Sequence, residues 1–301
     1  MEEKMNNYID LHMHSKYSDD GEFSPKQLVQ KCKDAGIQIM AIADHNSVKA
    51  IDEELKYCKE YGITWIAAIE IDCVYKGVNL HVLGYGIDYQ DEEIIKLEEN
   101  VLMQELKVSS KKLDLTNALG FHLTNEDMEK VSSNGVWTGE MFAQVLLEKE
   151  EYKHHEILKP YRKGGSRSDN PFVNFYWDYY AQGKPCYTEI IFPSFESIIN
   201  LIYETGGISV LAHPANNLKD NYALFDDMAM LGLDGVEAFS SYHNEDESKY
   251  FYDKGKEYEM LITCGSDYHG LTKPSIFLNQ VKCLIDQSEI EQQLHLYGLI
   301  K

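Results

Sequence analysis

Seven short apolar runs, rich in β-branched residues, recur along the chain. They predict strands at residues 8–12, 39–44, 64–75, 78–85, 208–213, 235–239 and 261–269. Most of these runs are followed by a helical pattern. One at residues 25–35 begins after Ser24 with Pro25 and ends at Gly36, as capped helices do. This alternation of strands and helices predicts an α/β fold.

Two of the runs are separated only by Lys76-Gly77, which predicts a hairpin. A two-residue turn would place Asp72 opposite His81. Glu70 would then be the diagonal neighbour of His81 on the same face of the sheet. The hairpin therefore predicts a carboxylate and an imidazole that can share an ion.

The segment between the fourth and fifth runs has a different character. It carries a long charged helical pattern at residues 91–115, shorter ones at 125–131 and 139–150, and an aromatic one at 172–180. We expect residues 1–87 and 188–301 to form the two parts of one domain. Residues 88–187 are expected to form a helical insertion that covers its site.

Metal-ligating side chains lie at or beyond the carboxyl ends of five of the seven runs: His12 and His14, His45, Glu70, His213, and Asp267 with His269. In α/β folds this end of the strands is where sites are built. His12 and His14 alternate along a strand and therefore share a face. Taken alone, such a pair could simply lie at the surface, but the repeated placement at one end indicates a site.

The chemistry of these side chains indicates metal ions. Imidazole and carboxylate without thiolate suit zinc, manganese or iron. A shared carboxylate can hold two ions ~3.5–4 Å apart, the geometry that clamps the attacking and leaving oxygens in phosphoryl transfer. No serine or cysteine nucleophile is then required.

Four motifs in this order resemble the polymerase and histidinol phosphatase (PHP) superfamily of metal-dependent phosphoesterases: Asp10-Leu11-His12-Met13-His14-Ser15 with Ser18-Asp19, Ala43-Asp44-His45-Asn46, Ala212-His213-Pro214, and Gly265-Ser266-Asp267-Tyr268-His269. The resemblance implies a distorted (β/α)7 barrel, here with a helical insertion between strands 4 and 5. The insertion resembles the cap of the nucleotide-phosphatase and exonuclease subgroup.

By motif position, the resemblance implies two to three divalent transition metals. The first would be held by His12, His14, Glu70 and Asp267, the second by Glu70, His81 and His213, and the third by Asp19, His45 and His269.

The loop that supplies the last carboxylate departs from the family pattern. The family usually has Ser-Asp-Gly, whereas this chain has Ser18-Asp19-Asp20-Gly21. Counting forward from His14 selects Asp19, and counting back from Gly21 selects Asp20. We favour Asp19.

Other polar residues are weaker candidates. Asp44 could orient an imidazole or cap a helix. His243 could bind phosphate or protonate a leaving group, or be a loop histidine. The basic cluster Arg162, Lys163 and Arg167 could grip a substrate phosphate or be a solvated loop.

Charge and cysteine content narrow the class of partner. With 28 basic and 50 acidic residues the formal net charge is −22, which opposes an extended nucleic-acid surface. The six cysteines are scattered, as in a reduced, cytoplasmic protein. Neither a secretory signal nor an apolar run of ~18 residues is evident, so we expect no membrane partner.

The sequence thus predicts a metal-dependent phosphoesterase. Its substrate would be a small phosphate ester, such as a nucleotide, a nucleoside bisphosphate or the end of a short oligonucleotide. Two alternatives remain: an amidohydrolase-like C–N hydrolase and a non-catalytic metal-binding scaffold. No lysine that could be carbamylated lies at a strand end, which disfavours the first, and the complete ligand set disfavours the second.

Overall fold

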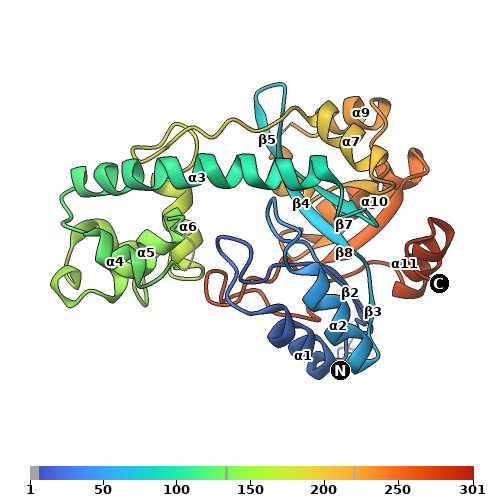
Figure 1. The fold of residues 1–301 in the computed structure, drawn as a ribbon, viewed down its shortest axis with the longest axis horizontal. Coiled ribbons are helices and arrows are strands. Elements are labelled where there is room, and N and C mark those ends of the chain that lie inside the picture. The colour runs from blue at the N-terminus through green and yellow to red at the C-terminus, as the bar shows by residue number, and fades with distance from the viewer. Residues whose placement is uncertain (1–6, 133–134, 220) are drawn as a thin grey trace.

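The computed structural model describes residues 7–132, 135–219 and 221–301, and has an α/β architecture (Figure 1). Its strands are β1 (Ile9–Met13), β2 (Ile39–Ile42), β3 (Thr64–Trp65), β4 (Ala68–Tyr75), β5 (Val78–Tyr85), β6 (Ile208–Leu211), β7 (Gly235–Ser240) and β8 (Leu261–Gly265). The run predicted at 64–75 is two strands rather than one. The other six runs match one strand each.

The strands form two sheets, with the orders β1-β2-β3 and β4-β5-β6-β7-β8. Pairing is parallel throughout the first sheet and from β6 to β8, and antiparallel between β4, β5 and β6. Isolated bridges join Met13 to Tyr268 and His45 to Glu70, where the two sheets meet. The α/β prediction is confirmed, whereas the described strands form two sheets rather than one closed barrel.

The hairpin prediction is confirmed. Strands β4 and β5 are antiparallel, and Asp72 pairs with His81 across them. The turn between them is Lys76-Gly77, both with positive φ. Because side chains two residues apart share a face, Glu70 and Asp72 both reach His81.

The helices are α1 (Pro25–Ala35), α2 (Ile51–Tyr61), α3 (Glu92–Ala118), α4 (Asn125–Glu129), α5 (Gly139–Glu148), α6 (Pro171–Tyr179), α7 (Phe195–Glu204), α8 (Pro214–Leu218), α9 (Ala223–Met230), α10 (Glu245–Glu257) and α11 (Gln287–Leu296). Short 3₁₀ turns span Glu150–Tyr152 and Glu156–Tyr161. Helix α1 has the predicted ends: Ser24 and Gln27 form a capping box, and Gly36 is left-handed. None of the helices in the described ranges combines the length and apolarity needed to cross a membrane.

Residues between Leu113 and Cys186 form a hydrophobic cluster of their own. It includes fully buried Phe142 and Phe175, and it belongs to the C-terminal part of α3 and to α4–α6. In Figure 1 these helices lie to one side of the strands, and α3 extends from them across to the strands. A separate large cluster surrounds the strands. The helical segment therefore has its own core.

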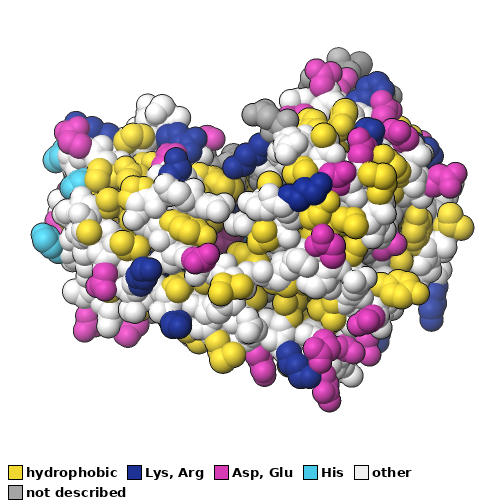
Figure 2. Space-filling model, turned by 90° about the horizontal axis from the view of Figure 1, so that it is seen from above, with side chains coloured by type: hydrophobic (Ala, Val, Ile, Leu, Met, Phe, Trp, Pro, Cys, Tyr) yellow, Lys and Arg dark blue, Asp and Glu magenta, His cyan; other side chains and the backbone are white. Residues whose placement is uncertain are grey.

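Charged side chains are dispersed over the face of the molecule that Figure 2 shows. On the face shown in Figure 2, Lys and Arg lie singly or in small groups among Asp and Glu, without a continuous basic stripe. All six cysteines are buried and free.

Candidate metal centre

Five histidines surround the carboxylate of Glu70, which is fully buried in β4. Its Oε2 lies 3.2 Å from His12 Nε2, His14 Nε2 and His45 Nδ1, and its Oε1 lies 3.0 Å from His81 Nδ1 and His213 Nε2. These histidines come from or follow four different strands. The two oxygens of one carboxylate thus face two sets of imidazoles.

The first group of potential ligands has the dimensions of a tetrahedral site. His12, His14, Glu70 and Asp267 are all buried, and the distances measured among their nearest donor atoms run from 2.9 to 3.4 Å. Donors about 2.0–2.1 Å from a tetrahedral ion are roughly 3.3–3.4 Å from one another. An ion of zinc size fits this group.

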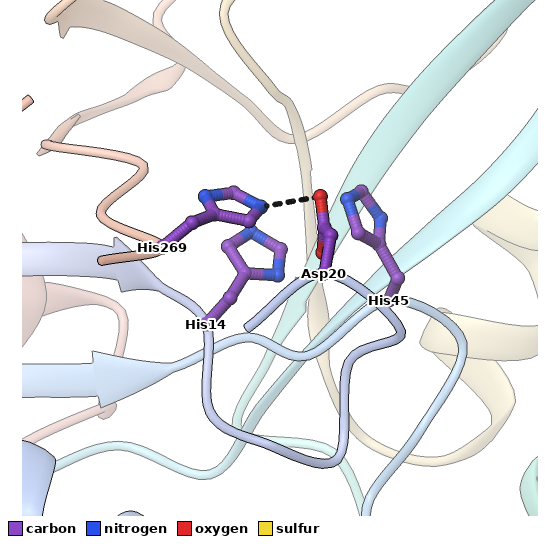
Figure 3. Close-up of side chains that lie close together, drawn as sticks. All are labelled: His14, Asp20, His45 and His269. Atoms are coloured by element: carbon purple, nitrogen blue, oxygen red, sulfur yellow. Dashed lines mark ion pairs between the residues drawn. The ribbon is translucent and has the colours of Figure 1, made fainter. Parts of the chain in front are cut away.

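A second group joins His14, Asp20, His45 and His269, which converge in Figure 3. The Nε2 of His269 lies 3.1 Å from Asp20 Oδ2, and the rings of His14 and His269 stack at 3.9 Å. These side chains come from the loops that follow β1, β2 and β8.

A third group consists of His45, Glu70 and His81. His213 adjoins it through its contact with Glu70 Oε1. The backbone of His213 has φ of 23°, a region that non-glycine residues rarely adopt. Its N–H donates to Glu237 Oε2 at 2.7 Å, which holds this conformation. Such strain is typical of functional sites.

Several buried polar atoms at the centre lie close to other potential ligands without forming a hydrogen bond of good geometry: Glu70 Oε2, Asp267 Oδ1, His45 Nδ1 and His269 Nε2. Buried polar atoms without partners are costly, and bound cations are one way to satisfy them. The donor set and these atoms therefore fit divalent metal ions.

The local charges also favour a cation. Burial would lower the pKa of His12, but Glu70, Glu237 and Asp267 outweigh it and raise that pKa well above its usual value. Burial would raise the pKa of Glu70, but the neighbouring histidines hold it well below its usual value. Burial lowers the pKa of His14 to about 4, so this imidazole is neutral, as a metal ligand must be.

Hydrogen bonds fix the orientation of the imidazoles. His12 Nδ1 lies 3.0 Å from Glu237 Oε1, and His269 Nδ1 donates to the carbonyl oxygen of Asp267. In both rings Nε2 is left to face the centre. Carboxylates and carbonyls that hold the distal nitrogen of a metal-binding histidine are common in metalloproteins.

Asp44, predicted as a catalytic or orienting residue, acts on the centre indirectly. It accepts from Ser15 N at 2.6 Å and from Ser18 Oγ at 3.1 Å. Ser18 Oγ in turn lies 2.8 Å from His14 Nδ1 and accepts from His45 N. Because its oxygens are engaged by this loop, the structure supports the orienting role and not the catalytic one.

The structure brings Asp20, and not the favoured Asp19, to the group with His269. The loop is tightly placed next to Asp20, because a Cβ at Gly21 would be 1.9 Å from the carbonyl oxygen of Ser15 and Thr272 Oγ1 donates to the carbonyl oxygen of Asp20. The geometry thus favours Asp20 over Asp19 for this group, which is the alternative obtained by counting back from Gly21.

His243 is not placed for acid–base chemistry. Its Nδ1 donates to the carbonyl oxygen of Ala238 at 3.0 Å, and its Nε2 accepts from Ala215 N at 3.2 Å. Both nitrogens are thus used in joining β7 to the segment after His213. Burial lowers the pKa of His243, which agrees with a neutral ring.

The predicted basic cluster is largely engaged within the insertion. Arg162 donates to the carbonyl oxygens of Leu147 and Tyr152. Arg167 donates through Nε and Nη2 to the two oxygens of Asp178, both at 3.0 Å, while Lys163 is exposed. Hydrogen bonds engage Arg162 and an ion pair engages Arg167, and these contacts give no support to a phosphate-binding role.

Comparisons with known proteins agree with this geometry. Residues 10–239 match the PHP domain family. The chain belongs to this family. The part of the chain that matches contains most of the residues that converge on Glu70. Asp267 and His269 follow it in the sequence.

Curated relatives are similar over nearly their whole length. A 5'-3' exoribonuclease of Haemophilus influenzae is 27% identical over 88% of this chain and 91% of its own. A phosphoribosyl 1,2-cyclic phosphate 1,2-diphosphodiesterase of Eggerthella lenta is 25% identical over 87% and 94%. A 3',5'-nucleoside bisphosphate phosphatase of Chromobacterium violaceum is 24% identical over 87% of each chain.

Two solved structures share the fold of this PHP protein. One, described as an amidohydrolase from Chromobacterium violaceum, has a TM-score of 0.77 at 20% identity and covers 95% of this chain and 97% of its own. The other, a candidate metal-dependent phosphoesterase from Bifidobacterium adolescentis, has a TM-score of 0.76 at 24% identity over 95% of each chain. At these identities the likeness concerns the fold alone.

Sequence reasoning missed two residues beside Asp267. Tyr242 donates to Asp267 Oδ2 at 2.5 Å, and Lys273 Nζ lies 2.7 Å from the same oxygen. Together they leave Asp267 Oδ1 facing His12 and His14. Neither residue belongs to a metal motif, so only their position in space marks them. Glu237 gave a weak signal, as a carboxylate within the predicted sixth strand.

We expect Asp20→Asn to weaken metal retention by more than about tenfold, because even residues that only orient a ligand typically cost 10–100-fold. Asp19→Asn, one residue earlier in the same loop, should retain the metal content of the wild type. Elemental analysis of the two purified variants checks this. Greater metal loss in Asp19→Asn would show instead that Asp19 is the ligand, as counting forward from His14 predicts.

Replacing Glu237 with Gln should lower metal affinity about 10–100-fold. In the variant an NH2 group replaces one of the two carboxylate oxygens. It would face either the N–H of His213 or the Nδ1 of His12, and it cannot accept a hydrogen bond as the oxygen does. Glu257→Gln, at an exposed helix position (59% exposed side chain), is the matched control. Titration of the metal-free proteins with Zn²⁺ measures the difference. Equal affinities in the two variants would show that Glu237 does not orient the ligands.

Proposed function

We infer that this PHP-family protein is a metal-dependent phosphoesterase that hydrolyses small phosphate esters of nucleotide type. The observation that carries this inference is the Glu70 carboxylate, whose two oxygens face separate sets of histidines. One shared carboxylate between two ligand sets is the arrangement of two-metal phosphoryl-transfer sites. The named activities of the three curated relatives all concern phosphate esters.

We propose two to three divalent ions, of zinc, manganese or iron. His12, His14, Glu70 and Asp267 would hold the first, Glu70, His81 and His213 the second, and Asp20, His45 and His269 the third. Ions bound here would supply Lewis acidity toward the phosphoryl oxygens and a water of lowered pKa. The predominance of nitrogen and carboxylate donors supports these metals over calcium or magnesium.

The surrounding residues prepare the centre for this chemistry. Glu237 and Ser18 hold His12 and His14 so that their Nε2 atoms converge. Tyr242 and Lys273 hold the outer oxygen of Asp267, and the Lys273 side chain is largely buried at 12% exposure. Ligands fixed in this way need little reorganisation when charge develops in the transition state.

The proposed architecture is a distorted (β/α)7 barrel, with residues 88–187 inserted between its fourth and fifth strands as a cap. The two isolated bridges between the sheets support the barrel, and the separate core between Leu113 and Cys186 supports the cap. The substrate would be a nucleotide, a nucleoside bisphosphate or the end of a short oligonucleotide. Six free, buried cysteines support a reducing, cytoplasmic location.

Assays of the metal-loaded protein on phosphomonoesters, phosphodiesters and carboxamides test the reaction class. We expect hydrolysis of phosphate esters, loss of that activity after treatment with a chelator, and recovery when Zn²⁺ or Mn²⁺ is restored. Hydrolysis of amides alone would contradict the proposal and would favour C–N hydrolysis on the same fold.

Glu70→Gln should reduce kcat at least about a hundredfold, since the Lewis acidity of correctly held ions is worth several kcal/mol. A neutral amide cannot bridge two cations as a carboxylate does. Steady-state kinetics at saturating metal measures the loss, and thermal unfolding checks that the fold is retained. Near-wild-type activity would exclude the bridging role.

A further inference from the structure

A cavity of about 290 Å³ lies beside the metal centre, and both Asp19 and His45 line it. Its walls are the loops that follow β1 and β2 and the N-terminal half of α3. Tyr17 lies in the first of these walls, Asn46 in the second and Leu102 in the third. The cavity thus lies between the strand-end loops and the first helix of the proposed cap.

The inner end of the cavity reaches the metal centre. His45 lines it with a side chain that is 21% exposed, and its Nδ1 lies 3.2 Å from Glu70 Oε2. His45 also belongs to the group with Asp20 and His269 shown in Figure 3. A molecule with one end over the ions can therefore extend into this cavity.

The outer wall is held in place by Glu98 of α3. Its carboxylate is largely buried, accepts from Val48 N at 3.1 Å and pairs with Lys49 Nζ at 2.5 Å. Ser47 Oγ also donates to Glu98. These contacts tie α3 to the loop after β2. They therefore hold two walls of the cavity together.

The lining combines an apolar surface with polar edges. Val101 and Leu102 of α3 and the ring of Tyr17 contribute the apolar part. The polar edge includes Asn46, whose amide is already hydrogen-bonded to Asp72. Charge does not favour a phosphate here, because the lining holds more carboxylates than lysines and Lys49 is paired with Glu98. A flat, neutral group with hydrogen-bonding edges suits this composition.

We propose that this cavity is the nucleoside subsite, which takes the base and sugar of a substrate whose phosphate lies over the metal centre. The proposal rests on the phosphoesterase function inferred above. The volume is just below the ~300–1,000 Å³ typical of small-molecule sites, so it suits one nucleoside rather than a strand. The ring of Tyr17 offers a face on which a base can stack.

Filling the cavity from α3 tests this subsite. Leu102→Trp places a larger side chain in the cavity, whereas Met103→Trp, at the next position, adds the same group where the native side chain is 62% exposed. Both metal-loaded variants are assayed on a nucleoside 3',5'-bisphosphate and on a small aryl phosphate. The readout is the ratio of kcat/KM for the two substrates, with kcat and KM reported separately.

We expect Leu102→Trp to lower the ratio of nucleotide to aryl phosphate kcat/KM roughly five- to 150-fold, the range that corresponds to loss of base stacking. The change should lie mainly in KM. Met103→Trp should leave both substrates unaffected. Tyr17→Ala should lower the ratio in the same direction and Tyr17→Phe should restore it, which provides a second test if the tryptophan disturbs folding.

An unchanged ratio in Leu102→Trp and in Tyr17→Ala would overturn the subsite while leaving the phosphoesterase function intact. Equal loss on both substrates would likewise overturn it, because the cavity would then serve the centre and not the nucleoside. If the wild type hydrolyses neither phosphate ester, the proposed function itself fails and the subsite fails with it.

Discussion

The arrangement of this molecule depends on one buried carboxylate. Glu70 lies fully inside the protein with five imidazoles around it, and burial of an isolated charge is unfavourable. The histidines and the ions they can hold offset that cost. Strands β1, β2, β5 and β6 must therefore bring residues to one place on β4, because His12, His14, His45, His81 and His213 all contact Glu70. Displacing any of these segments would remove one of the contacts that offset the buried charge.

Around this carboxylate, several ligands are held by partners that do not themselves face the centre. Glu237 contacts His12 and the backbone of His213, and Ser18 links Asp44 to His14 and His45. Tyr242 and Lys273 do the same for Asp267. The strained backbone of His213 is held by two of these contacts, from Glu237 and, through Ala215, from His243. Preorganisation of the centre is thus distributed over residues far apart in the sequence.

The helical segment and the strands meet beside this centre. The helical segment has its own core, and the contacts of Arg162 and Arg167 lie within that segment. Its first helix nevertheless forms one wall of the cavity that reaches His45, and Glu98 ties that helix to the loop after β2. The proposed metal ligands thus come from the strands and the loops that follow them. The proposed substrate selection takes place where α3 meets those loops.

The sequence by itself determined the local features. Periodicity and capping residues predicted both ends of α1 correctly. Ser24 and Pro25 act on its first turn, and Gly36 directly follows its last residue. The Lys76-Gly77 turn gave the pairing of Asp72 with His81, because a two-residue turn leaves one register. The placement of the histidines and carboxylates in and after the predicted strands identified most of the candidate ligands.

Tertiary structure decided what depends on contacts across the chain. It placed Asp20 in the group with His14, His45 and His269, which spacing along the chain left open. It engaged His243, Arg162 and Arg167 with partners elsewhere in the chain, and it brought Lys273 and Tyr242 to Asp267. Local interactions are encoded within a few residues, whereas these contacts exist only once the chain has folded.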